Sequence, residues 1–144
     1  MQDVEGYRLL IADVYELAGV SRRTSEDLAR SVGQTAARWH VLSVLSDGPR
    51  TVPSAARRLG LAPQSVQRVV ADLVASGHLE AMDNPDHVRS PLMRLTELGR
   101  SVVDELFARS ADNRADVLAR AGVTADELAV ARGVLRKLVG ALRD

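Results

Sequence analysis

The 144-residue sequence predicts a mainly α-helical chain of the α+β class, in which two helical arms flank a centre that holds one β-hairpin. Three observations predict this organisation. All five prolines lie between positions 49 and 91, so the flanking segments are free to form long helices. Apolar residues recur at helical spacing in both flanks. Two short runs in the centre alternate between apolar and polar side chains, as half-buried strands do.

The first flank predicts one long amphipathic helix followed by a shorter one. The stripe of the long helix repeats at intervals of three and four residues and consists of Val4, Tyr7, Ile11, Val14 and Ala18. We expect the shorter helix to begin after Thr35, a residue type that caps helix N-termini, and to end at Asp47-Gly48-Pro49. Trp39, Leu42 and Leu45 share one face of it.

The last flank predicts two further helices. The first opens at Thr96-Glu97 and stops near Gly122, and Thr124 caps the second. The stripe of the second consists of Leu128, Ala131, Leu135, Leu138 and Leu142. Such stripes could pack on the chain's own core or form a homodimer interface. The small centre offers little surface to cover them, and exposed leucines favour aggregation. We therefore expect a dimer interface made by Val4, Ile11, Val14, Leu128, Leu135, Leu138 and Leu142.

The central segment, residues 50–99, contains two short predicted helices joined by a tight turn. Thr51 caps the first, Val52–Leu59, which tolerates Pro53 because this proline lies in its first turn. The turn is Gly60-Leu61-Ala62, and the second helix runs from Pro63 to about Ser76. Two short helices joined in this way are a helix-turn-helix.

The second of these helices has an inner and an outer face. The inner face carries Val66, Val69, Val70 and Leu73, and the outer face carries Pro63, Gln64, Ser65, Gln67, Arg68 and Ala71. Amide, hydroxyl and guanidinium groups suit the base edges of a DNA major groove. An ordinary solvated helix face has a similar composition, so this face alone leaves both interpretations open.

A β-hairpin is predicted directly after the helix-turn-helix. Leu79–Met82 and Leu92–Leu95 are the strands, and the polar, turn-forming residues from Asp83 to Ser90 are the loop. Pro91 lies at the start of the second strand, where a missing N–H is tolerated. A helix-turn-helix followed by such a hairpin is a winged helix. Arg89, near the end of the loop, is placed to enter a minor groove.

The charge of the chain is neutral in total but unevenly distributed. It has 19 basic and 19 acidic residues, whereas DNA-binding domains are usually basic. Residues 1–49 carry a net charge of −2, residues 50–100 carry +2, and residues 101–144 carry zero. Residues 50–70 contain four arginines and no acid. The positive field that DNA binding requires is therefore expected locally, over the helix-turn-helix.

Four segments, taken in order, resemble the MarR family of transcriptional regulators: Thr35–Leu42, Ala56–Leu61, the wing, and Leu95–Arg100. The resemblance implies a homodimeric winged-helix protein that binds pseudo-palindromic double-stranded DNA, usually as a repressor, and that is often released by a small aromatic or anionic ligand. It also implies one domain over 1–144, with a DNA-binding lobe at 35–100 and helical dimerisation arms at 1–34 and 101–144.

The wing and the recognition helix depart from the family pattern. The family's wing commonly reads Asp-Pro-x-Asp-Arg-Arg, whereas this chain has Asn84-Pro85-Asp86-His87-Val88-Arg89. Arg89 retains the wing arginine, but His87 and Val88 replace its usual charged neighbours. Ala62 stands where the family usually has a serine cap, and such a loss costs about 1 kcal/mol.

The residues expected to contact DNA are Ser54, Pro63, Gln64, Ser65, Gln67, Arg68 and Arg89. In the family a ligand cavity tends to lie between the dimerisation helices and the DNA-binding lobe. The side chains that suit such a cavity here are Tyr7, Tyr15, Trp39 and His40, although each also suits a core position.

Other chemistry finds little support in the sequence. The chain has no Cys, no G-x-S-x-G and no P-loop, and its three histidines lie 38 and nine residues apart, so we expect no enzyme, cofactor or metal site. His78 is expected to be structural. No uncharged stretch exceeds nine residues, which favours a cytoplasmic protein without a membrane span. The alternative to DNA binding is a winged helix that contacts only other proteins.

Overall fold

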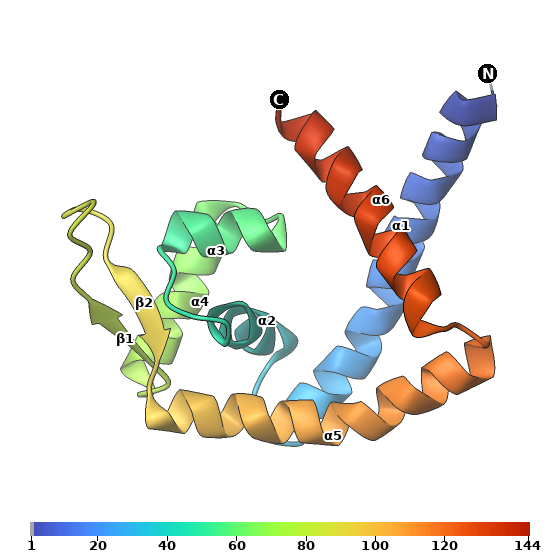
Figure 1. Ribbon diagram of the computed structural model, residues 1–144. Helices are drawn as coiled ribbons and strands as arrows, with labels where there is room; N and C mark the ends of the chain where they lie inside the picture. Colours follow the sequence, from blue (N-terminus) through green and yellow to red (C-terminus); the bar gives the residue numbers. More distant parts are fainter. Residues whose placement is uncertain (1) are drawn as a thin grey trace. The chain divides into compact units, whose positions relative to one another are not determined.

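Six helices and one two-stranded antiparallel hairpin make up residues 2–144, the part of the chain that the computed structural model describes (Figure 1). This confirms the predicted mainly helical, winged-helix fold class. The chain divides into two compact units, one reaching to Phe107 and the other spanning Ala108–Asp144. No helix within residues 2–144 is long and apolar enough to cross a membrane.

The N-terminal helices end and begin where local signals place them. Helix α1 spans Gln2–Arg30, and α2 spans Ala36–Leu45. Thr35 caps α2, because its extended backbone lets the side-chain oxygen accept a hydrogen bond from the Arg38 N–H at 3.2 Å. The predicted start of α2 is thus confirmed, and its C-cap is Ser46.

The helix-turn-helix consists of α3 (Val52–Leu59) and α4 (Pro63–Ala75), as predicted. Gly60 ends α3 in the left-handed conformation, at φ +70°, which suits glycine because it lacks a Cβ. Its N–H donates to the carbonyl oxygens of Ala56 and Arg57. Ala62 makes no side-chain cap on α4, as expected for alanine, and Pro63 begins that helix.

The wing is formed by β1 (Leu79–Met82) and β2 (Leu92–Leu95), which pair with Leu79 opposite Leu95 and Met82 opposite Leu92. Both strand ranges agree with the prediction. The alternation of burial is less regular than expected, because Ala81 is exposed although it shares a face with buried Leu79. The hairpin projects beyond the core in Figure 1, so only its base is covered by helices.

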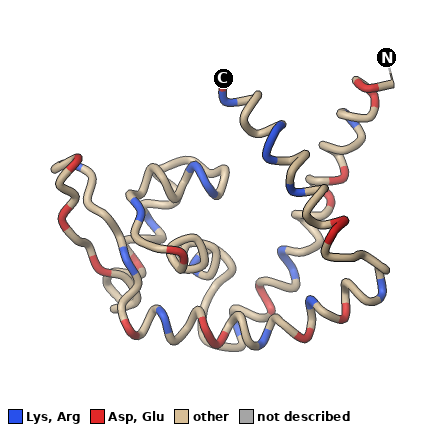
Figure 2. The backbone as a smooth tube through the Cα atoms, viewed as in Figure 1, with Lys and Arg blue, Asp and Glu red and all other residues tan. Residues whose placement is uncertain are grey.

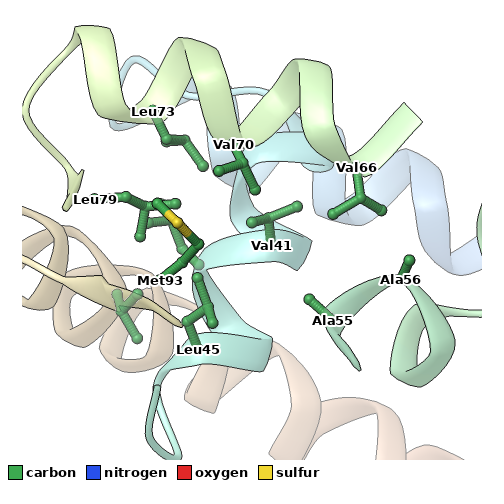
Figure 3. Close-up of a cluster of buried hydrophobic side chains, with 11 residues drawn as sticks. Val41, Leu45, Ala55, Ala56, Val66, Val70, Leu73, Leu79 and Met93 are labelled. Carbon is green, nitrogen blue, oxygen red and sulfur yellow. The ribbon is translucent and has the colours of Figure 1, made fainter. Parts of the chain in front are cut away.

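One hydrophobic core joins the helix-turn-helix, α2, the base of the hairpin and the start of α5 (Glu97–Ala121). Figure 3 shows Val66, Val70 and Leu73 of α4 pointing toward Val41 and Leu45 of α2. A smaller cluster of Ala29, Trp39 and Leu106 ties the end of α1 to α2 and α5. The buried inner face of α4 fixes which of its residues remain outside.

The unit from Ala108 onward contains the rest of α5 and helix α6 (Ala125–Arg143). Thr124 caps α6 with a reciprocal pair of bonds: Glu127 N–H donates to Thr124 Oγ1 at 3.2 Å, and Thr124 N–H donates to Glu127 Oε1 at 3.1 Å. This confirms the predicted cap. No residue of α6 is buried.

Helix α5 begins against the backbone that leads into β1. Thr96 Oγ1 donates to the carbonyl oxygen of Gly77 at 2.6 Å, and Thr96 N–H donates to the carbonyl oxygen of His78 at 3.1 Å. A Cβ on Gly99 would overlap that His78 carbonyl oxygen. The close approach of two backbones therefore requires glycine at position 99.

We predict that Gly99→Ala lowers the free energy of unfolding by about 1–3 kcal/mol, because α5 and the turn at His78 must move apart to admit the new methyl group. Gly133→Ala is the matched control, since nothing surrounds Gly133 in α6 and alanine there should gain roughly 0.5–1 kcal/mol. Denaturant unfolding of both variants measures the difference. Equal stabilities would contradict the role assigned to Gly99.

Candidate nucleic-acid interface

The outer face of α4 is exposed as the sequence predicted. Its burial divides as expected: Val66, Val70 and Leu73 are buried and Val69 is half-buried. The six residues assigned to the outer face are all exposed: Pro63, Gln64, Ser65, Gln67, Arg68 and Ala71. The glutamine amides and the Arg68 guanidinium are therefore accessible to a partner along one side of the helix.

A groove of about 650 Å³ lies between α4 and the wing. Gln64 and Gln67 line it from α4, and Arg89 lines it from the hairpin loop. Its floor is apolar and includes Val70, Val74 and Met93. The fold thus brings the predicted helix residues and the predicted wing arginine, more than 20 positions apart in sequence, to one surface. Pro63 lines the same groove.

The predicted contact Ser54 lies at the start of α3, beside a smaller pocket of about 370 Å³. Its N–H donates to Thr51 Oγ1 at 3.2 Å, and its hydroxyl oxygen accepts a bond from Arg50 Nη1 at 3.2 Å. The hydroxyl keeps its own proton for donation. Ser54 and Arg50 together thus present donors at an N-terminal helix end, an arrangement that suits an anion.

Arg50 is a candidate that the sequence reasoning did not single out. Its backbone pairs with Met93 of β2, because Arg50 N–H donates to the Met93 carbonyl oxygen at 3.1 Å and the Arg50 carbonyl oxygen accepts from Met93 N–H at 2.7 Å. This bridge fixes Arg50 beside the wing base. The acid-free run from position 50 to 70 was the only signal of its role, because the bridge joins residues 43 positions apart.

Basic residues gather over the helix-turn-helix rather than over the wing (Figure 2). Arg57 and Arg58 are exposed on α3, and Arg68 is exposed on α4. The hairpin loop, in contrast, carries Asp83 and Asp86 against Arg89. The positive field expected from the sequence is therefore carried by the helices, and the wing adds little net charge to it.

The loop of the wing is held by Asn84. Its Nδ2 donates to the Ser90 carbonyl oxygen at 2.9 Å, which closes the loop, and its Oδ1 accepts from the Asp86 N–H at 3.2 Å. His87 is exposed, and Val88 is 93% exposed. The atypical residues of the wing thus lie at the outside of a loop whose shape Asn84 maintains.

The four side chains suggested for an effector pocket lie in different surroundings. Trp39 is 3% exposed in the core, with the His40 ring stacked on it at 6.3 Å between centroids. His40 lines a pocket of about 250 Å³ with Arg50 and Arg58. Desolvation lowers the pKa of His40 below its ordinary value, and the nearby Arg22 charge lowers it further. Tyr7 and Tyr15 are exposed on α1.

The predicted dimerisation residues are accessible in the described chain. Val4 and Leu142 are each 70% exposed, and Val14 and Leu128 are also exposed. Ile11, Leu135 and Leu138 are half-buried. Within residues 2–144, no group of three or more His, Asp or Glu side chains could hold a metal ion.

Comparisons with known proteins place these features in a family. A sequence profile of the MarR family matches residues 32–90. An uncharacterized protein of Mycobacterium tuberculosis is 48% identical over 137 residues, which cover 93% of this chain and 92% of that protein.

Two solved structures share the fold. A mutant of Escherichia coli MarR complexed with operator DNA is 22% identical, with a TM-score of 0.70 over 92% of this chain and 95% of its own. Rhodococcus jostii CouR bound to p-coumaroyl-CoA is 19% identical, with a TM-score of 0.76 over 88% of both chains. At these identities the likeness supports the winged-helix architecture.

We predict that Asn84→Ala opens the wing loop without unfolding the core. Loss of a hydrogen bond worth about 1 kcal/mol should raise the rate of tryptic cleavage after Arg89 roughly fivefold. Asn84→Asp is the matched control for Oδ1, since it keeps this acceptor and loses only the donor to Ser90. If cleavage proceeds at the wild-type rate in Asn84→Ala, the loop is held by something else.

Proposed function

Since the chain belongs to the MarR family of transcription regulators, we propose that it binds double-stranded DNA sequence-specifically as a homodimer and acts as a repressor. Proteins of this family are transcription regulators rather than enzymes. The observation that carries the proposal is the groove where Gln64 and Gln67 of α4 meet Arg89 of the wing. We also propose a cytoplasmic location, where operator DNA is found.

The exposed face of α4 and the groove between α4 and the wing support docking on a duplex. An α-helix fits a major groove, and a hairpin loop beside it reaches the neighbouring minor groove. Gln64, Ser65 and Gln67 would read base edges, because amides and hydroxyls both donate and accept hydrogen bonds. Arg68 would hold a phosphate or a guanine, and Arg89 would anchor the wing.

Phosphate contacts would come from the basic helices and from Ser54. The hydroxyl of Ser54 retains a proton while it accepts a bond from Arg50, so both groups can donate to one phosphate. The described helix-turn-helix supplies this charge locally, in a chain that is neutral overall. Non-specific binding should therefore be modest, and the outer face of α4 should supply a large share of the affinity.

A homodimer would place two α4 helices about 34–36 Å apart in successive major grooves. Its interface would cover the exposed stripes of α1 and α6, because each large apolar side chain gains about 1.5–3 kcal/mol on burial. In this proposal residues 35–100 form the DNA-binding lobe of a single domain, and residues 1–34 and 101–144 form its dimerisation arms.

Release by a small ligand is the finer part of the proposal. The CouR structure is bound to p-coumaroyl-CoA, an aromatic and anionic molecule, which supports a ligand of that chemistry here. Tyr7, Tyr15, Trp39 and His40 remain the proposed pocket side chains. A ligand would act only through different affinities for two spacings of the α4 helices.

We predict that Arg89→Ala weakens binding to all duplexes, because one cation that neutralises phosphate charge is lost. The slope of log K against log salt concentration should become less steep by about one. Gln67→Ala should instead lose about 1–3 kcal/mol of discrimination at particular base pairs. Arg23→Ala, on α1, is the matched charge control and should change neither quantity. Affinity selection on random duplexes, followed by titrations at several salt concentrations, measures both effects.

Identical profiles for Arg89→Ala and Gln67→Ala across the selected sites would contradict these roles. If the protein instead binds a partner through α4 and the wing, with an affinity that hardly changes with salt, the result would favour the alternative, a winged helix that contacts only proteins.

We predict a dimer of twice the 15.5 kDa chain mass by light scattering at micromolar concentration. Leu142→Glu should raise the dimer dissociation constant at least about tenfold, because a charge replaces an apolar side chain in both copies. Val130→Glu is the control, since Val130 is 69% exposed and lies off the stripe of α6. A monodisperse wild-type monomer would refute the dimer.

A further inference from the structure

A cluster of polar side chains lies between the start of α2 and the end of α4. Gln34 precedes α2 and Arg38 lies in its first turn, whereas Ser76 is the C-cap of α4 and His78 follows two residues later. His78 is buried, which is uncommon for an ionisable side chain. The sequence predicted only that it would be structural. None of these four residues lines the groove that we assign to DNA.

The hydrogen bonds of the cluster determine its proton positions. Arg38 Nε, which can only donate, lies 2.7 Å from Gln34 Oε1, so the amide oxygen faces Arg38. The amide nitrogen of Gln34 therefore faces His78 Nε2 at 3.4 Å, and His78 Nε2 must accept. His78 then carries its proton on Nδ1 and donates to Ser76 Oγ at 2.7 Å.

Ser76 completes the pattern. Its Oγ accepts from Arg38 Nη2 at 2.9 Å and donates to the Leu73 carbonyl oxygen at 3.3 Å. With His78 neutral and its proton on Nδ1, its ring nitrogens pair with Gln34 and Ser76, whereas Arg38 Nη2, at 3.4 Å from Nδ1, contributes a positive charge beside the ring and not a hydrogen bond to it. A second proton on Nε2 would face the amide N–H group of Gln34, and turning that amide would break the 2.7 Å bond to Arg38.

The cluster joins the recognition helix to the rest of its unit. Ser76 is the C-cap of α4, and Gln34 is tied to the end of α1 because its N–H donates to the Ala29 carbonyl oxygen at 2.8 Å. The backbone of His78 donates to Leu73 at 2.8 Å and accepts from Thr96 at 3.1 Å. The end of α4 is thereby fastened to α1, α2 and α5.

We propose that Arg38 is a positioning residue for the recognition helix, and that it holds the end of α4 in place for DNA binding only while His78 is neutral. The inference rests on the proposed function, because it concerns the placement of the same DNA-reading helix. The inference goes beyond that function because it makes the protonation state of His78 a regulator of where the end of α4 lies.

The charges around His78 agree with this dependence. Arg38 of α2 is the charged group beside the ring, at 3.4 Å from Nδ1, and the hydroxyl of Ser76, the C-cap of α4, lies at 2.7 Å. The His78 carbonyl oxygen accepts from the N–H of Thr96, which precedes α5, and lies close to Gly99 in the first turn of α5. None of the contacts described to His78 within residues 2–144 is a carboxylate. Burial lowers the pKa of His78 below its usual 6.5, and the Arg38 charge lowers it further.

The sign of the pH effect follows from that direction. As the pH falls below the ordinary histidine pKa, the unfolded or loosened chain takes up the proton before the joined form does. The joined form is therefore stabilised above about pH 6.5 and progressively loses that stabilisation at lower pH.

The test measures affinity of the full-length protein for a duplex selected from random sequences, at about pH 8 and about pH 5.5 and constant ionic strength. The wild type should bind roughly fivefold or more weakly at the acidic pH. His78→Asn, which keeps a donor near Ser76 but cannot titrate, should lose this pH dependence. Arg23→Ala on α1, the charge control used above, should retain it.

Two further measurements separate positioning from charge. Arg38→Lys keeps the charge but lacks the planar guanidinium that places one donor nitrogen at Gln34 and another at Ser76, so it should bind the duplex more weakly at both pH values. NMR titration of the His78 ring should give a pKa below about 6.5 in the wild type and a higher pKa in Arg38→Ala.

The proposal is overturned if His78→Asn keeps the wild-type pH dependence, if Arg38→Lys binds like the wild type, or if the His78 ring titrates at about 6.5 in the wild type. If His78→Asn does not fold, the titration and Arg38→Lys still decide. If the wild type binds no duplex at about pH 8, the proposed function fails, whereas the titration still tests the bond pattern around His78.

Discussion

Burial of the inner face of α4 is the constraint on which the rest of the unit depends. Val66, Val70 and Leu73 pack against α2 and the base of the wing, and each gains about 1.5–3 kcal/mol on full burial. Because a helix is rigid, fixing three positions on one side also fixes which residues lie on the other side and where their Cα atoms stand. The exposed glutamines are therefore presented by the core, not by contacts of their own.

The turn between α4 and β1 connects this core to the start of α5 and to α2. The backbone at Gly77 and His78 accepts two bonds from Thr96 and approaches Gly99 too closely for any side chain. The side chain of His78 faces Arg38 of α2 in the same place. A movement of α2 or α5 would therefore reach the end of α4 directly, through backbone contacts that leave little room to adjust.

Features with local causes could be predicted from the sequence, and features with distant partners could not. Thr35, Thr124 and Pro63 mark helix starts through chemistry within one turn, so these starts were predicted correctly. The alternation of apolar and polar residues likewise located both strands. The bridge of Arg50 to Met93 and the contact of Arg38 with His78 join positions about 40 residues apart, which no periodicity reveals. The exposure of Ala81 was missed because alternation indicates a strand but does not show how far along the strand the helices cover it.

The distribution of charge bears on how such a surface would choose its sites. Asp83 and Asp86 stand beside Arg89 in the wing, so a phosphate near the loop meets both signs of charge. The stretch from 50 to 70, which includes Arg57, Arg58 and Arg68, contains no acidic residue. In the proposed complex, attraction to any duplex would be concentrated over the helices that carry the proposed base-reading side chains, and the wing would add a single arginine. A surface built in this way loses less affinity to competing sequences than one with a broadly basic face, because non-specific contacts scale with the number of phosphates neutralised.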